Sequence, residues 1–212
     1  QEAKDLQNRA VSQMVAMLAR GKKEYTVKAP TGSGKTYMMA DFMNRILATN
    51  SNIIFLVSSL SKSDLAEQNY KSFCALCENG TFTNLNPYLI NSETSGESSI
   101  FIPTDHNVYV LPRDLYKEKS KLKDEGSFLN FLSETTGDLQ KGTAGKIIYV
   151  IKDECHIATK NLDELGNYFS VVINFSATPK LSRKQLSDVE ISNTDAENAK
   201  LIKQVEFQPE DD

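Results

Sequence analysis

The chain has 212 residues, of which 40% are hydrophobic and 25% charged, a composition typical of one globular domain large enough to bury a central sheet. The formal net charge of -4 excludes a general attraction to nucleic acids or membranes, so any nucleic-acid contact must be local. Apolar runs such as Ile53–Val57 are too short to cross a bilayer, and no signal-peptide pattern opens the chain. We therefore expect a cytoplasmic protein without a membrane partner.

Short apolar runs alternate with stretches of helical spacing along most of the chain. Strands are predicted at residues 25–27, 53–57, 108–111, 147–151 and 171–175, and helices at 35–47 and 60–77. This alternation is typical of an α/β fold in which a mostly parallel central sheet carries helices on both faces. Residues 79–105 are rich in Ser, Thr, Asn and Gly, which predicts a loop or an insertion.

A glycine-rich segment, APTGSGKT at residues 29–36, lies between the first predicted strand and the first predicted helix. Glycines let backbone N–H groups turn toward phosphate oxygens, and the following helix points its positive end at the same place. The segment predicts that ATP or a close relative is bound by Thr31, Gly32, Ser33, Gly34, Lys35 and Thr36. Lys35 suits the β- and γ-phosphates, and the Thr36 hydroxyl suits Mg²⁺. Ala29 replaces the first glycine of the common pattern, and a Gly-Ser turn before a surface lysine is the structural alternative.

Two consecutive carboxylates, Asp153 and Glu154, follow the predicted strand at 147–151. Ligands of open α/β sheets bind at the carboxyl edge of the strands. Asp153 is placed to hold Mg²⁺ through its waters, and Glu154 to accept a proton from the water that attacks the γ-phosphate. A solvated helix start is the alternative for this pair, but the upstream phosphate loop favours the catalytic interpretation.

A third segment, SAT at residues 176–178, follows the predicted strand at 171–175. In this order, APTGSGKT, DECH and SAT resemble motifs I, II and III of the superfamily 2 helicases and translocases, over nearly the whole chain. The resemblance implies a RecA-like P-loop NTPase domain over residues 1–180, the first motor domain of such an enzyme. It also implies that Ser176 and Thr178 couple the nucleotide state to DNA or RNA.

Two more residues take candidate roles from this resemblance. His156 ends the DECH motif and would sense the γ-phosphate, with a structural histidine at the strand end as the alternative. Gln7, in LQNRAV at residues 6–11, resembles the glutamine that reads adenine in this superfamily. An amide can pair with both the donor and the acceptor on the edge of adenine. A plain surface glutamine is equally open.

Nucleic-acid contacts are predicted at two places. Val57–Leu60 with Leu65–Gln68 resembles motif Ia, where a strand end touches a phosphate, so Ser58 and Ser59 are candidates although proline and threonine are usual there. The basic run that begins at Arg113 is interleaved with acidic residues, which favours a solvated helix face. Only Arg113 is kept from that run as a candidate contact.

A narrower resemblance links DECHIA, NFSATP and the segment 187–203 to the Res subunit of type III restriction enzymes. It implies an ATP-dependent translocase on double-stranded DNA, with a second motor domain and an endonuclease domain in the same parent chain. It also implies a modification methyltransferase as a partner subunit. Residues 181–212 then represent a linker toward the second motor domain.

The chain contains no QxxGRxGR-like segment. In superfamily 2, arginines of the second motor domain complete the hydrolytic site, so we expect this chain to bind nucleotide but to turn it over slowly. Three other functions stay open at this point: an RNA or DNA-repair helicase domain of superfamily 2, a self-sufficient P-loop NTPase or kinase, and a non-catalytic module gated by nucleotide.

Overall fold

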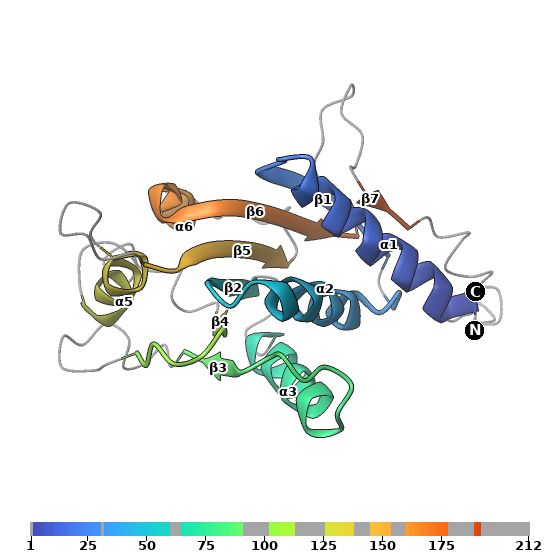
Figure 1. Ribbon diagram of the computed structural model, residues 1–212, viewed down its shortest axis with the longest axis horizontal. Coiled ribbons are helices and arrows are strands. Elements are labelled where there is room, and N and C mark those ends of the chain that lie inside the picture. The colour runs from blue at the N-terminus through green and yellow to red at the C-terminus, as the bar shows by residue number, and fades with distance from the viewer. Residues whose placement is uncertain are drawn as a thin grey trace, which may run out of the picture.

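The computed structural model describes residues 2–30, 32–59, 65–90, 102–112, 126–137, 145–153, 160–177 and 189–191. The helices are α1 (Glu2–Ala19), α2 (Lys35–Thr49), α3 (Leu65–Glu78), α5 (Gly126–Thr136), α6 (Lys160–Asp163) and the short 3-10 helix η3 (Gly166–Tyr168). The strands are β1 (Glu24–Lys28), β2 (Ile53–Ser59), β3 (Pro87–Leu89), β4 (Val108–Leu111), β5 (Ile147–Asp153), β6 (Phe169–Ser176) and β7 (Val189–Glu190). Figure 1 shows their arrangement in space.

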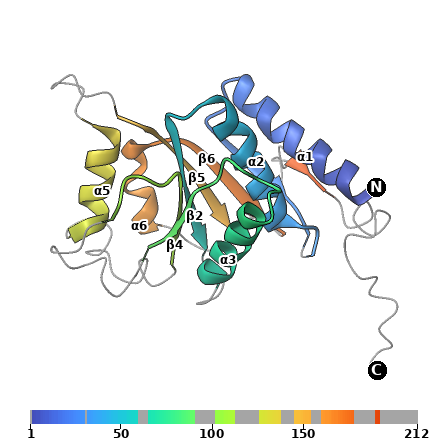
Figure 2. The same ribbon diagram turned by 60° about the horizontal axis from the view of Figure 1, so that its bottom comes forward.

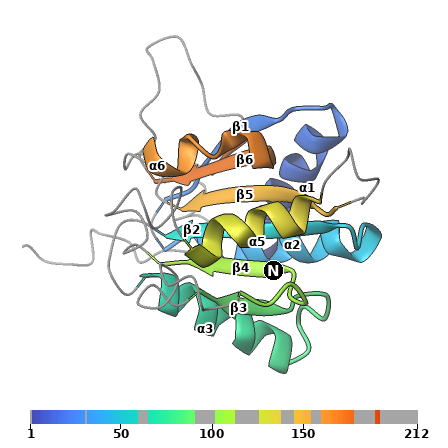
Figure 3. The same cartoon turned by 90° about the vertical axis from the view of Figure 1, so that its left-hand side faces the viewer.

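The strands form one 7-stranded sheet in the order β3-β4-β2-β5-β6-β1-β7. Each described strand pair is parallel, and Figure 3 shows the strands following one another from β1 to β3 in this order. The five predicted strands are β1, β2, β4, β5 and β6, which confirms the predicted α/β fold. Parallel neighbours in a sheet must be joined by crossover connections, and helices such as α2 and α3 lie between successive strands in the chain.

Helices cover both faces of the sheet because side chains alternate along each strand. In β2, Phe55 and Val57 belong to the hydrophobic core beneath α1, α2 and α3. Ile54 and Leu56 belong to a second core, which α5 and α6 close with residues such as Phe128. Figure 2 shows α1, α2 and α3 on one side of the sheet and α5 and α6 on the other. A strand buried on both faces appears in the sequence as a continuous apolar run, which is how β2 was predicted.

The structure differs from the sequence-based expectation at both edges of the sheet. Residues 79–105 were expected to form a loop or an insertion, yet they contain β3, which pairs with β4. Residues 181–212 were expected to form a linker, yet β7 lies within them and pairs with β1. Both strands are two or three residues long, too short to show an apolar period, so only their pairing partners reveal them.

The strand register brings the three predicted motifs to one edge of the sheet. Ser59 at the end of β2 is opposite Asp153 at the end of β5. Asp153 is in turn opposite Phe175 of β6, and Ser176 is opposite Lys28 of β1. Because the carboxyl ends of parallel strands share an edge, the phosphate loop after β1 lies beside the ends of β5 and β6.

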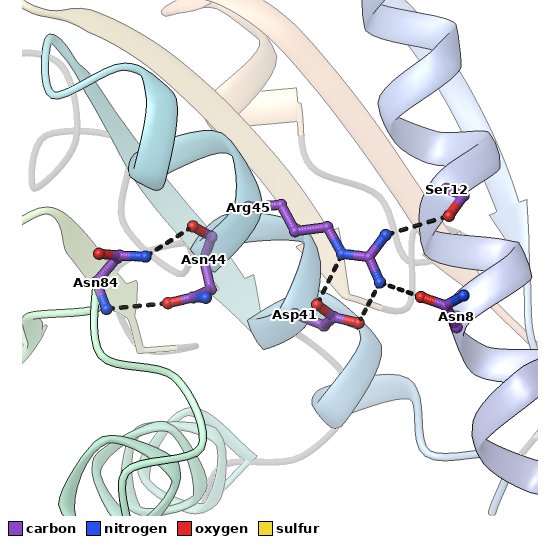
Figure 4. A network of polar contacts seen from close by, with 6 residues as sticks. All are labelled: Asn8, Ser12, Asp41, Asn44, Arg45 and Asn84. Atoms are coloured by element: carbon purple, nitrogen blue, oxygen red, sulfur yellow. Dashed lines mark hydrogen bonds and ion pairs between the residues drawn. The ribbon is translucent and has the colours of Figure 1, made fainter. Parts of the chain in front are cut away.

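A polar network fastens α1 to α2 (Figure 4). The Arg45 guanidinium of α2 forms a bidentate ion pair with Asp41, at 2.9 and 3.0 Å. The same group donates to the side chains of Asn8 and Ser12 on α1, at 2.5 and 3.1 Å. A guanidinium can make these contacts together because its donors form a rigid fork. Figure 4 also shows Asn44 of α2 paired with Asn84, at 2.9 and 3.3 Å.

Candidate functional site

The phosphate loop turns sharply between β1 and α2. The backbone N–H of Ala29 donates to the Ser176 carbonyl oxygen at 3.0 Å, and that of Ser33 donates to Pro30 at 3.0 Å. Gly32 and Gly34 have φ angles of 83° and 84°, a left-handed conformation that favours glycine. Gly34 is also the N-cap of α2. The positive end of a helix of 15 residues therefore opens onto the loop.

Gln7 of α1 lies against this loop. Its Nε2 donates to the carbonyl oxygen of Ser33 at 3.1 Å, and the side chain is 9% exposed. A Cβ atom on Gly34 would lie 2.1 Å from Gln7 Nε2, so a side chain at Gly34 would collide with Gln7. The glutamine for which an adenine contact was predicted is thus a neighbour of the phosphate loop itself.

Lys35 and Asp153 form an ion pair at the centre of the site. The distance from Lys35 Nζ to Asp153 Oδ1 is 2.8 Å, and the two side chains are 18% and 1% exposed. A carboxylate this buried needs a cation or hydrogen bonds to stay charged. The predicted phosphate ligand and the predicted metal ligand therefore contact each other directly in this structure.

Asn69 of α3 completes the arrangement, although sequence reasoning missed it. Thr36 Oγ1 donates to Asn69 Oδ1 at 3.2 Å, and Asn69 Nδ2 donates to Asp153 Oδ2 at 3.1 Å. Asn69 shares the buried face of α3 with Ala66 and Phe73. A polar residue at a position of helical spacing where apolar residues are expected is the signal that could have drawn attention to it.

The side chains present fit a nucleotide with its metal. In the part of the chain that the structure describes, the buried hydroxyl of Ser33 has no hydrogen-bond partner, which suits a phosphate oxygen. Thr36 and Asp153 supply the hard oxygen ligands that Mg²⁺ prefers, and both meet at Asn69. Within the described residues no group of three or more His, Cys, Asp or Glu residues could hold a metal alone.

The other predicted site residues differ in what the structure says of them. Ser176 is fully buried, and its carbonyl oxygen supports the start of the phosphate loop. Ser58 is also fully buried, and its hydroxyl donates to the Ile151 carbonyl oxygen at 3.5 Å, so it faces into the sheet. The backbone of Ser59 pairs with β5. Outside the described residues lie Thr31, Arg113, Glu154, His156 and Thr178.

Comparisons with known proteins identify a family and solved structures of similar fold. The family model described as "Type III restriction enzyme, res subunit" (ResIII) matches residues 1–181. The fold is similar to a nuclease-deletion mutant of the Type ISP restriction-modification enzyme LlaGI in complex with a DNA substrate mimic, with a TM-score of 0.53 and 13% identity. It is also similar to the Sulfolobus solfataricus SWI2/SNF2 ATPase core in complex with dsDNA, with a TM-score of 0.50 and 16% identity. No protein of curated function matches the sequence.

The two solved structures are much longer than this chain. The alignment with the first covers 92% of this chain and 20% of that one. The alignment with the second covers 82% of this chain and 31% of that one. At these identities the likeness concerns the fold, a RecA-like core. Within the described residues no helix is both long enough and apolar enough to cross a bilayer.

Proposed function

This chain belongs to the type III restriction enzyme res subunit family, as an N-terminal motor domain of the helicase and translocase type, and we propose that it binds MgATP to drive movement along double-stranded DNA. The observation that carries the proposal is the contact of Lys35 with Asp153, beside Thr36, at the end of the phosphate loop. Family membership supports a DNA substrate, as do the two solved structures of this fold that contain DNA.

The proposed binding step is an exchange of partners at Lys35. In the structure, the ammonium group neutralises Asp153, a carboxylate that is only 1% exposed. With nucleotide, Lys35 turns to the β- and γ-phosphates. Asp153 then needs another cation, because an unpaired buried carboxylate costs several kcal/mol. Thr36 and Asp153 would hold Mg²⁺, which neutralises charge on the phosphates and on Asp153 alike.

Hydrolysis needs groups beyond the described part of this site. Glu154 is the proposed general base and His156 the proposed sensor, while Ser176 and Thr178 pass the nucleotide state on toward the DNA. Arginines from a second motor domain of the same parent chain would complete the site, and such residues contribute about 10³-fold or more in rate. Further partners that family membership suggests are a modification methyltransferase subunit and a downstream nuclease domain.

The test compares nucleotide binding and turnover by the chain with and without duplex DNA. Lys35→Ala should weaken the binding of a fluorescent, non-hydrolysable ATP analogue about 10- to 100-fold, because it removes a charged donor to phosphate. Lys71→Ala is the matched control, since Lys71 is 72% exposed and pairs only along α3 with Glu67 in the described structure. Its affinity should equal that of the wild type.

Turnover decides between this function and its rivals. Slow hydrolysis by the lone chain, with affinity lost in Lys35→Ala, supports a first motor domain that awaits its arginine-bearing partner. Brisk turnover that ignores nucleic acid would mean a self-sufficient NTPase. Stimulation by duplex RNA but not by duplex DNA would move the assignment to an RNA helicase.

A further inference from the structure

Asn69 is the polar side chain of this site that the known motifs leave unassigned. It comes from α3, whose other buried residues include Ala66 and Phe73, and it is itself 2% exposed. Burying an amide on an apolar helix face is unfavourable unless its hydrogen bonds are made. Here they are made to two residues that belong to different parts of the nucleotide site.

The orientation of the amide follows from its neighbours. An ionised carboxylate only accepts hydrogen bonds, so the NH₂ group of Asn69 must face Asp153, at 3.1 Å. The amide oxygen then faces Thr36, whose hydroxyl donates to it at 3.2 Å. Asn69 thus joins Thr36, which is 33 positions away from it in the sequence, to Asp153, which is 84 positions away.

Both hydrogen bonds leave metal-binding oxygen atoms available. A threonine hydroxyl has one proton and two lone pairs, so with its proton on Asn69 the lone pairs of Thr36 stay free for a cation. Asn69 engages Oδ2 of Asp153, whereas Lys35 engages Oδ1. When Lys35 turns to a phosphate, Oδ1 is released while Asn69 still holds the carboxylate in place.

We propose that Asn69 is a positioning residue that orients Thr36 and Asp153 for the magnesium ion of a bound nucleotide. The inference rests on the proposed function of the site. Residues that orient metal ligands typically contribute 10- to 100-fold in metal affinity. Asn69 acts on the metal through two ligands at once, and it touches neither the metal nor the nucleotide.

The experiment measures how Mg²⁺ changes the affinity of the chain for a fluorescent, non-hydrolysable ATP analogue. Two variants are compared: Asn69→Leu, which fills similar space without hydrogen-bonding atoms, and Asn69→Ala, which leaves space. Ser72→Ala, at an exposed position of the same helix, is the control. In both Asn69 variants the Mg²⁺ concentration for half-maximal effect should rise about tenfold or more. Affinity measured in EDTA should stay within about twofold of the wild type, because Asn69 orients metal ligands and not phosphate ligands.

Several outcomes overturn the inference. If affinity falls equally with and without Mg²⁺, Asn69 serves the structure alone. If Asn69→Ala shifts the Mg²⁺ requirement but Asn69→Leu does not, the residue only fills space. Thermal melting reports folding, and Asn69→Ala carries the test if Asn69→Leu fails to fold. If the wild-type chain binds the analogue with Mg²⁺ and the Asn69 variants show the same Mg²⁺ dependence, only this inference is contradicted and the proposed function stands. A wild-type chain that binds no nucleotide contradicts the proposed function and the inference together.

Discussion

At the scale of single residues, Gly34 has two reasons to be glycine. Its φ of 84° lies where other residues pay about 1–2 kcal/mol. A Cβ atom there would also lie 2.1 Å from Gln7 Nε2, and Gln7 holds the Ser33 carbonyl oxygen. A side chain at Gly34 therefore strains the backbone of the phosphate loop and displaces the side-chain amide of Gln7.

Gly34→Ala should accordingly weaken binding of the ATP analogue about tenfold. The phosphate-binding shape of the loop needs a left-handed residue at this position, and that conformation costs alanine about 1–2 kcal/mol. Fluorescence titration measures the affinity and urea denaturation the stability. Gly21→Ala is a close control, since Gly21 has a φ of 81° and nothing within 4 Å of the added atom. It should lose similar stability and keep its affinity. If both variants bind the ATP analogue with equal affinity, the conformation of Gly34 does not matter for nucleotide binding.

At the scale of elements, α1 depends on polar contacts as well as on its apolar face. Leu6, Ala10, Val11 and Met14 pack into the core, while Arg45 of α2 binds Asn8 and Ser12 from outside. The ion pair of Arg45 with Asp41 lies within α2 and holds the guanidinium in place for these contacts. The network thereby sets where α1, and with it Gln7, meets the phosphate loop.

Arg45→Ala should lower the free energy of unfolding by about 1–2 kcal/mol, since it removes charge-assisted hydrogen bonds that are partly exposed. Hydrogen exchange should also quicken in α1 before the rest of the domain. Lys71→Ala is the comparison here too, because its pair with Glu67 joins two exposed side chains of one helix and contributes about 0.5 kcal/mol or less. If both variants lose the same free energy of unfolding, the contacts of Arg45 with α1 contribute nothing measurable to stability.

At the scale of the whole molecule, β7 closes one edge of the sheet. Val189 and Ile191 are each 1% exposed and belong to the core beneath α1. The backbone N–H of Ile191 donates to the Lys28 carbonyl oxygen at 2.8 Å, and Lys28 pairs with Glu190 at 3.2 Å. This segment pairs with the strand that leads into the phosphate loop, so the sheet includes residues beyond 180.

A truncation tests this boundary. Removing residues 189–212 should lower the free energy of unfolding by about 3 kcal/mol, because it takes two buried aliphatic side chains out of the core and exposes the edge of β1. Removing residues 192–212 leaves β7 in place, so the difference in stability between the two truncated forms measures the contribution of β7. Urea denaturation of both forms gives the comparison. If the two truncations behave alike, β7 contributes nothing to the domain.

The candidate site shows how far the sequence reaches. Lys35, Thr36 and Asp153 were predicted to meet because strands of a parallel sheet bring their carboxyl ends to one edge, and the structure places them together. Their roles stay predictions. Ser58 was a candidate for nucleic-acid contact, yet it is fully buried, because a strand position alone does not say which side chain reaches the surface.

The sequence by itself determined the family and the sheet, since motif order and apolar runs are local properties of the chain. The tertiary structure alone decided that Asn69 joins Thr36 to Asp153 and that Gln7 touches the phosphate loop. It also decided that β3 and β7 extend the sheet at its edges. Contacts between residues 26 to 84 positions apart depend on how α1, α3 and the strands pack. The spacing of apolar residues along the sequence does not predict that packing. The partners of an isolated polar residue on an apolar helix face can therefore be identified only in the folded structure.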